Sequence, residues 1–158
     1  MKQTWLVGIL ASMLVVGTTA AQTPRQGDAQ SQGEVPTGES MLGSVNIPRP
    51  VTADGKPLAA GQYQIRLTPQ EAQPSVPGIK MERWVEFVRG GQVRGREVVS
   101  IVPAAEEKDL MPGPDAGKPP RNGAKVELLK GEEYVRVWLN RRGVNYLLHL
   151  PVSAKTSM

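Results

Sequence analysis

The sequence contains no cysteine, one histidine and one phenylalanine among its 158 residues. Without cysteine the chain cannot form disulfides, and it lacks the lipid-bearing cysteine that begins a bacterial lipoprotein. A zinc site needs three or four histidine, cysteine or carboxylate ligands, so zinc is effectively excluded. We therefore expect no metal and no cofactor, and a domain whose stability depends on its hydrophobic core alone.

Long apolar runs are also missing, except near the N-terminus. Residues 6–16 are apolar apart from Ser12, follow the positive charge of Lys2 and precede the small residues 17–21. This run is shorter than the roughly 20 residues of a membrane-spanning helix, and the pattern is typical of a cleavable signal peptide. We expect cleavage after Ala21, or after Ala20, and a periplasmic or extracellular protein with no stable membrane anchor. An uncleaved anchor is the alternative.

A strong excess of one charge is absent as well. Removal of residues 1–21 takes away Lys2 and leaves 18 basic against 15 acidic side chains. Acidic residues are interleaved with basic ones along nearly every segment, whereas nucleic-acid binders cluster their lysines and arginines. The composition thus predicts no nucleic-acid partner, and it favours an anionic over a cationic envelope polymer.

The remaining sequence divides at about Met41. Residues 22–40 are mostly Gln, Thr, Pro, Gly and Ser, which predicts a disordered tether. Residues 41–154 consist of short runs rich in Val, Ile, Leu and aromatics, separated by turn-forming residues. This pattern predicts an all-β domain, an antiparallel β-sandwich of about seven strands or a small barrel.

The clearest predicted strands are 62–68, 134–140 and 144–150, and weaker ones are 44–47, 84–88, 93–102 and 126–129. Pro48 and Pro50 place the strand 44–47 at a sheet edge. Alternation predicts which side chains of the three clearest strands face the core. These are Tyr63, Ile65, Leu67, Val135, Val137, Leu139, Val144, Tyr146, Leu148 and Leu150.

One segment carries a family resemblance. Residues 53–65 read Ala-Asp-Gly-Lys-Pro-Leu-Ala-Ala-Gly-Gln-Tyr-Gln-Ile. This stretch resembles the Asp-Gly-x-x-Leu-x-x-Gly-x-Tyr segment of exported bacterial immunoglobulin-like and transthyretin-like β-sandwich modules. The resemblance implies a turn at Asp54-Gly55 and a strand opened by Gly61-x-Tyr63. It covers 13 residues and implies a stalk, adhesion or accessory binding module, with no catalytic residue.

Sequence motifs for catalysis are weak. His149 is the one possible imidazole base, and no Gly-x-Ser-x-Gly segment supplies a nucleophile. Gly113 to Lys118 has the wrong spacing for a phosphate loop, and Pro119 stands where a Ser or Thr would hold magnesium. We therefore predict no catalytic residues.

Aromatic side chains on the polar faces of strands are the best candidates for a ligand surface. Trp84 shares a strand face with Glu86, and Trp138 shares one with Arg136, opposite the faces assigned to the core. Such tryptophans can stack on a sugar ring or fill a partner's pocket; the alternative is that loops bury these faces too. The candidate ligand-binding residues, in order, are Trp138, Trp84, Arg136, Arg66 and His149.

These observations predict an exported, non-enzymatic binding module for a polysaccharide or an envelope protein. A small secreted enzyme that uses the long loop 103–122 is one alternative, because loops of about 20 residues are unusual unless they are functional or disordered. A periplasmic structural subunit recognised through an open sheet edge is the other.

Overall fold

The computed structural model describes residues 33–74, 77–107, 117–129 and 131–153, so the expected signal peptide at 1–21 lies outside the described residues. In that part of the chain the regular structure is strands plus one 3-10 turn, η1 (Ala104–Glu106). None of the described elements is a helix long and apolar enough to cross a membrane. The strands are β1 (Ser40–Ile47), β2 (Val51–Ala53), β3 (Lys56–Leu58), β4 (Gly61–Ala72), β5 (Met81–Arg89), β6 (Gln92–Val102), β7 (Ala124–Leu128), β8 (Tyr134–Arg141) and β9 (Val144–Pro151).

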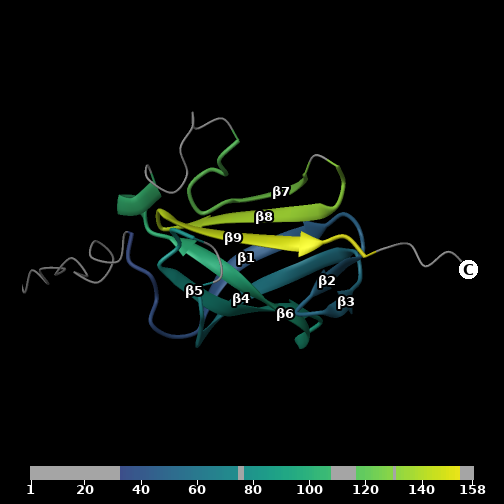
Figure 1. Cartoon of the computed structure of the whole chain (residues 1–158). Coiled ribbons are helices and arrows are strands. Elements are labelled where there is room, and N and C mark those ends of the chain that lie inside the picture. Colours follow the sequence, from purple (N-terminus) through teal and green to yellow (C-terminus); the bar gives the residue numbers. More distant parts are fainter. Residues whose placement is uncertain (1–32, 75–76, 108–116, 130, 154–158) are drawn as a thin grey trace, which may run out of the picture.

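Seven strands form one antiparallel sheet in the order β1-β4-β5-β6-β9-β8-β7. The two end strands, β1 and β7, approach each other, and β1 also approaches β8, so the sheet is nearly closed into a barrel (Figure 1). The β2–β3 hairpin packs beside β6 and β9. The all-β prediction is confirmed, with the small barrel as the observed form, and the strand that Pro48 and Pro50 follow lies at an end of the sheet.

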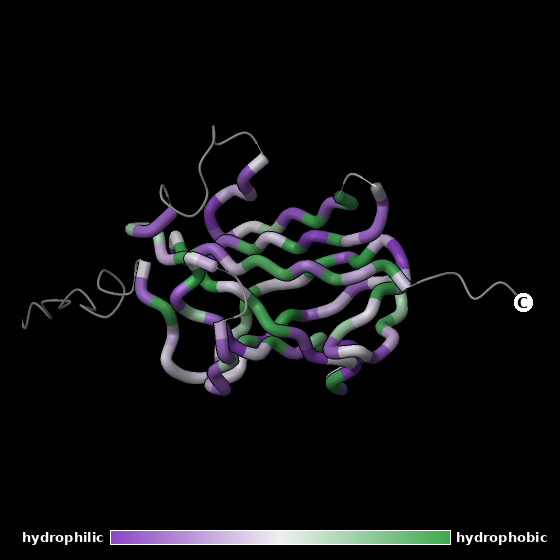
Figure 2. The backbone as a smooth tube through the Cα atoms, viewed as in Figure 1, coloured by the Kyte–Doolittle hydropathy of each residue, from purple (hydrophilic) through white to green (hydrophobic). Residues whose placement is uncertain are grey.

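The hydrophobic core fills the barrel interior. Polar and apolar residues alternate along the strands (Figure 2), and alternate side chains point to opposite faces of a sheet. All ten side chains predicted to face the core are buried. Phe87 joins them from β5, where its ring meets that of Tyr63 edge to face with centroids 5.9 Å apart.

Two-residue turns close three of the hairpins, one of them at Gly90 and Gly91 between β5 and β6, with φ angles of 59° and 73°. Asp54 and Gly55 have φ angles of 48° and 72° and join β2 to β3, which confirms the predicted turn. Arg142 and Gly143 have φ angles of 52° and 86° and join β8 to β9. Positive φ at both central positions is typical of the hairpin turns that match strand twist. The strands β2 and β3 were not predicted, because three residues each are too few to show alternation.

Residues 33–39 lie against the barrel, although the sequence places them in the tether. The Gly33 amide donates a hydrogen bond to the Arg142 carbonyl oxygen at 2.7 Å, and Val35 packs on the core. The Arg83 guanidinium, from β5, donates to the carbonyl oxygens of Pro36 and Gly38. The acceptors of these hydrogen bonds are backbone carbonyls, so the side-chain composition of residues 33–39 could not predict that the segment packs on the barrel. The rest of the expected tether, residues 22–32, lies outside the described residues.

Candidate functional site

The five residues predicted for a ligand surface all lie on the outer face of the main sheet. Arg66 is on β4, Trp84 on β5, Arg136 and Trp138 on β8, and His149 on β9. Each alternates with buried core residues of its own strand. The first four are partly buried and His149 is exposed, so the face is neither fully open nor covered. The strand register divides the five into two groups.

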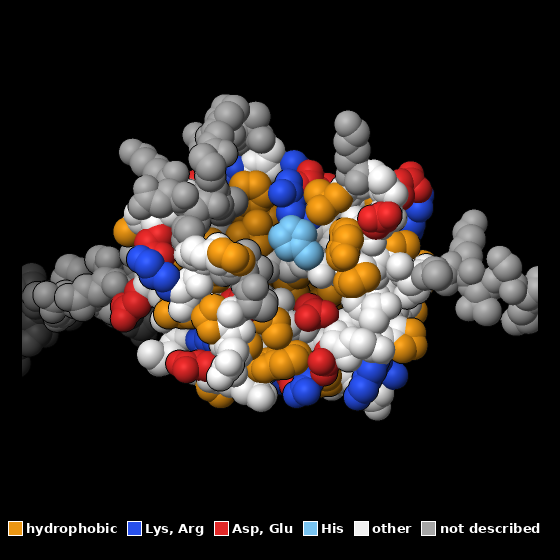
Figure 3. All heavy atoms as spheres, viewed as in Figure 1, with side chains coloured by type: hydrophobic (Ala, Val, Ile, Leu, Met, Phe, Trp, Pro, Cys, Tyr) orange, Lys and Arg blue, Asp and Glu red, His pale blue; other side chains and the backbone are white. Residues whose placement is uncertain are grey.

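The first group, which we call the Trp138 group, comprises Trp138, Arg136 and His149. In the β8–β9 register, Arg136 lies opposite His149 and Trp138 lies opposite Leu147. The single histidine is visible near the middle of the face in Figure 3, with basic and hydrophobic side chains beside it. The arrangement places an indole, a guanidinium and an imidazole within one pair of strands.

A buried polar network fixes the edge of the Trp138 indole. Its Nε1–H donates to Oδ1 of Asn145 at 3.0 Å, and Asn140 Nδ2 donates to the same oxygen at 3.0 Å. Asn145 Nδ2 in turn donates to Oε2 of Glu107 at 3.1 Å, and Glu107 pairs with Lys118. The hydrogen bond from Lys118 lowers the pKa of Glu107, which burial opposes and Asn145 reinforces. A tryptophan held in this way presents its ring without first losing conformational freedom.

Charges around the Trp138 group are largely paired. Glu127, opposite Arg136 in the β7–β8 register, accepts from Arg136 Nε at 2.6 Å and lies 3.0 Å from Lys125 Nζ. Burial raises the pKa of Glu127, but hydrogen bonds from Lys125 and Arg136 outweigh it, so the net shift is downward. Although His149 contacts solvent, partial desolvation by the surrounding face and, as a smaller effect, the charge of Arg136 lower its pKa. The neutral imidazole therefore predominates at pH 7, and the Arg136 guanidinium beside it is paired with the Glu127 carboxylate.

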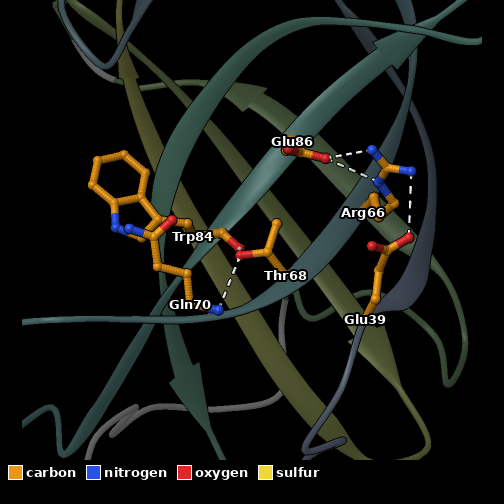
Figure 4. A network of polar contacts seen from close by, with 6 residues as sticks. All are labelled: Glu39, Arg66, Thr68, Gln70, Trp84 and Glu86. Atoms are coloured by element: carbon orange, nitrogen blue, oxygen red, sulfur yellow. Dashed lines mark hydrogen bonds and ion pairs between the residues drawn. The ribbon is translucent and has the colours of Figure 1, made fainter.

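The second group is Trp84 with Arg66. Arg66 lies between Oε2 of Glu86, 2.5 Å from its Nη2, and Oε1 of Glu39, 3.3 Å from its Nη1, and Figure 4 shows the Trp84 indole apart from these charges. The hydroxyl of Thr68 donates to the backbone oxygen of Trp84 at 2.9 Å. The guanidinium carbon of Arg96 lies 4.3 Å from the centroid of the Trp84 ring and covers it.

The two tryptophans are separated by β6 and β9. They are three inter-strand steps of about 4.8 Å apart across the sheet. They are also offset by two residues along the strands, because Leu147 pairs with Ser100 and not with Val98. Val98, opposite Trp84 on β6, and Leu147, opposite Trp138 on β9, lie between them. The outer face thus carries a tryptophan at each end of a diagonal row that includes Val98 and Leu147, and the polar Ser100 lies beside Leu147. The arginine at Trp138 is less closely stacked than the one at Trp84, because the guanidinium carbon of Arg136 is 5.8 Å from the ring centroid.

Sequence reasoning missed a cluster at the end of the barrel where residues 33–39 pack. Arg83 is buried there at 4% exposure, and Tyr146 at 1%. Arg141 and Arg142, at the β8–β9 turn, share a hollow with Tyr146. The alternation of β5 could have drawn attention to Arg83, which falls on the inward phase with Val85 and Phe87. Tyr146 was placed correctly in the core, but no pattern indicates the environment of its hydroxyl.

His149 has no hydrogen bond or ion pair within the described part of the chain, so the geometry there gives it no partner for acid–base catalysis. Over the same residues, no group of three or more His, Cys, Asp or Glu side chains could hold a metal ion. No family model matches the chain, and no curated protein or solved structure matches it.

Proposed function

We propose that the protein is an exported, non-enzymatic module that binds a polysaccharide on the outer face of its sheet. The observation that supports this most is Trp138, partly exposed on that face and held at its edge by Asn145. A flat indole offers a large apolar surface at low entropic cost, and it stacks against the C–H faces of sugar rings. Arg136 and His149 beside it supply hydrogen-bond donors and acceptors for hydroxyl or carboxylate groups.

An anionic polysaccharide is the preferred class of ligand. The expected mature chain carries 18 basic and 15 acidic side chains. A modest positive balance attracts polyanions and repels polycations. The three inter-strand steps of about 4.8 Å between the tryptophans span more than one sugar unit, so a polymer suits this face better than a monosaccharide. Export rests on the predicted signal peptide, and the resemblance of residues 53–65 to exported β-sandwich modules agrees with it.

The test is a titration of intrinsic tryptophan fluorescence with alginate, an acidic polysaccharide, and with neutral dextran of similar length. The protein is recovered from the periplasm of an exporting bacterium, and its intact mass reports cleavage after residue 21. We expect saturable binding of alginate that Trp138→Ala weakens about tenfold or more, as for a truncated hot-spot aromatic. Trp84→Ala, whose ring Arg96 covers, is expected to weaken binding less.

Failure of every polysaccharide to bind would overturn this ligand class, and an equal effect of the two substitutions would overturn the assignment to Trp138. Export is tested separately, because an unprocessed protein retained in the cytoplasm contradicts it whatever the ligand.

A second candidate is a structural subunit recognised by strand addition. The observation in its favour is that β1 and β7 end the sheet order and are hydrogen-bonded to a neighbouring strand on one side only, in the described part of the chain. An unpaired edge can accept a strand from a protein partner through main-chain hydrogen bonds. Crosslinking in the periplasm tests this candidate, which predicts adducts from β1 or β7 and none from the Trp138 group.

The secreted-enzyme alternative depends on the loop 103–122. Residues 108–116 of this loop lie outside the described residues. Its described ends are used structurally, since Glu107 and Lys118 extend the network that holds Trp138. This observation favours a binding role for the loop over a catalytic one.

A further inference from the structure

One end of the barrel contains a hollow of about 500 Å³, which we call the mouth hollow. Residues 33–39 and the β8–β9 turn both lie at this end, opposite the β2–β3 hairpin (Figure 1). Its volume is within the range of about 300–1,000 Å³ typical of small-molecule sites, which often occur at barrel mouths. Val35, Pro36 and Leu42 supply an apolar wall, while Arg141, Arg142 and Tyr146 supply polar groups.

The hydroxyl of Tyr146 has no hydrogen-bond partner in the described part of the chain, and it is not among the fully buried unpaired polar atoms there, so it is accessible from the mouth hollow that the residue lines. The rest of the side chain is buried, with 1% of the residue exposed. A hydroxyl placed in this way can donate to water or to a ligand. Burial raises the pKa of Tyr146 to about 12, so the group stays protonated at neutral pH and has a proton to donate. A ligand acceptor would satisfy it.

Positive charge surrounds this hydroxyl. The charges of Arg83 and Arg141 both act on Tyr146 and favour its anionic form, against the effect of burial. Arg83 donates only to carbonyl oxygens, those of Thr68, Pro36 and Gly38, and no carboxylate among the described residues pairs with it. Burial lowers the pKa of Arg83, and the charge of Glu71, opposite it in the β4–β5 register, offsets only part of that effect. A buried cation is costly, and a further anion nearby reduces that cost.

Acidic side chains at the hollow limit the ligand's charge. Glu39 is paired with Arg66 and Glu34 is exposed on the wall. Two carboxylates at the rim disfavour a dianion such as a phosphate monoester more than they disfavour a monoanion. A carboxylate also matches a guanidinium and a hydroxyl donor in geometry.

We propose that the mouth hollow binds a small amphiphilic carboxylate, whose carboxylate accepts from the Tyr146 hydroxyl and Arg141 and whose apolar body lies against Val35, Pro36 and Leu42. This site is separate from the outer face that carries Trp138. It is formed partly by residues 33–39, so ligand binding and the docking of that segment stabilise each other.

Titration calorimetry on the full chain with octanoate tests the proposal, and octanamide serves as the neutral ligand of the same length. We expect octanoate to bind and octanamide to bind at least about tenfold more weakly, since the neutral amide cannot form the charge-assisted hydrogen bonds of a carboxylate. Tyr146→Phe, which keeps the buried ring, and Arg141→Gln are each expected to weaken octanoate binding about tenfold. Arg94→Gln, at an exposed arginine of β6, is the matched control and leaves it unchanged.

The proposal is overturned if octanoate does not bind, if octanamide binds equally well, or if Tyr146→Phe has no more effect than Arg94→Gln. Circular dichroism of each variant separates loss of binding from loss of fold. Trp138→Ala leaves octanoate binding intact, so failure of the polysaccharide proposal and failure of this one are distinguishable.

Discussion

Two effects set the charge state of His149, the partial desolvation of its ring and the charge of one neighbour, Arg136. Burial lowers its pKa first, and the positive charge of Arg136 lowers it further. The unfolded chain therefore binds a proton at His149 at a higher pH than the folded chain does. The contribution of His149 to the free energy of unfolding is fully present above pH 6.5, the ordinary pKa of histidine. It is lost as the pH falls from 6.5 toward the lower pKa of the folded state.

His149→Gln is expected to remove this part of the pH dependence. The measurement is the free energy of unfolding by urea at several pH values between about 4 and 8 for the wild type and the variant, since this range brackets the ordinary histidine pKa. Carboxylates titrate in both proteins, so the difference between the two curves isolates the imidazole. Parallel curves would contradict the environment described for His149.

The sequence predicted which face of the sheet each side chain lies on, but it did not predict the hydrogen-bond partners of those side chains. Alternation placed Trp138 and His149 on the outer face, because side-chain direction in a strand depends only on position along it. It could not reveal Asn145 as the acceptor for Trp138, because that contact depends on the register between β8 and β9. The same limit hid Arg83, whose acceptors are backbone carbonyls distant in the sequence.

At the scale of elements, the β8–β9 hairpin contains a strained residue. Arg142 adopts a φ of 52° in a two-residue turn, a conformation that asparagine and glycine tolerate better than long side chains do. Arg142→Asn is expected to raise the free energy of unfolding by about 0.5–1 kcal/mol, because Asn-Gly is the favoured pair for this turn. Thermal unfolding with Arg94→Asn as the control checks it, and an unchanged or lower midpoint would refute the assigned strain.

The segment 33–39 depends on one side chain of a neighbouring element. Arg83 donates to Pro36 and Gly38 and so connects this segment to β5. Arg83→Leu is expected to increase hydrogen exchange at the Gly33 amide at least about tenfold, since hydrogen bonds to a charged group contribute about 1.5–3 kcal/mol. Exchange at the β4 and β5 amides serves as the internal reference. If Gly33 exchanges at the wild-type rate, Arg83 does not hold the segment.

Elements were predictable where they are long and one-sided. The predicted strands 62–68, 134–140 and 144–150 correspond to parts of β4, β8 and β9. Seven residues are enough to show a repeated alternation of polar and apolar side chains. For the β2–β3 hairpin, the sequence predicted only the turn at Asp54-Gly55 and neither strand. The boundary between tether and domain at residue 40 was predicted from composition. Composition indicates where core-forming side chains are absent, but it gives no information on backbone contacts.

The whole molecule combines a nearly closed sheet with two surfaces of different chemistry. The outer face carries aromatic and paired charged side chains, whereas the mouth hollow carries a free hydroxyl near arginines. The core that supports both is apolar and continuous, as the cysteine-free composition requires. The order of the strands and the closure of the sheet were not predictable, because the alternation of polar and apolar residues is compatible with either a sandwich or a barrel.

The central claim is that Trp138 and its neighbours form a polysaccharide-binding face. Its most direct test is nuclear magnetic resonance of the indole N–H groups and the His149 imidazole during titration with alginate. The account predicts that the Trp138 indole and His149 signals shift together and saturably, the Trp84 indole shifts less, and the Gly33 amide at the barrel mouth does not move. Shifts at Gly33 and none at Trp138, or no shift at any of these groups, would contradict it.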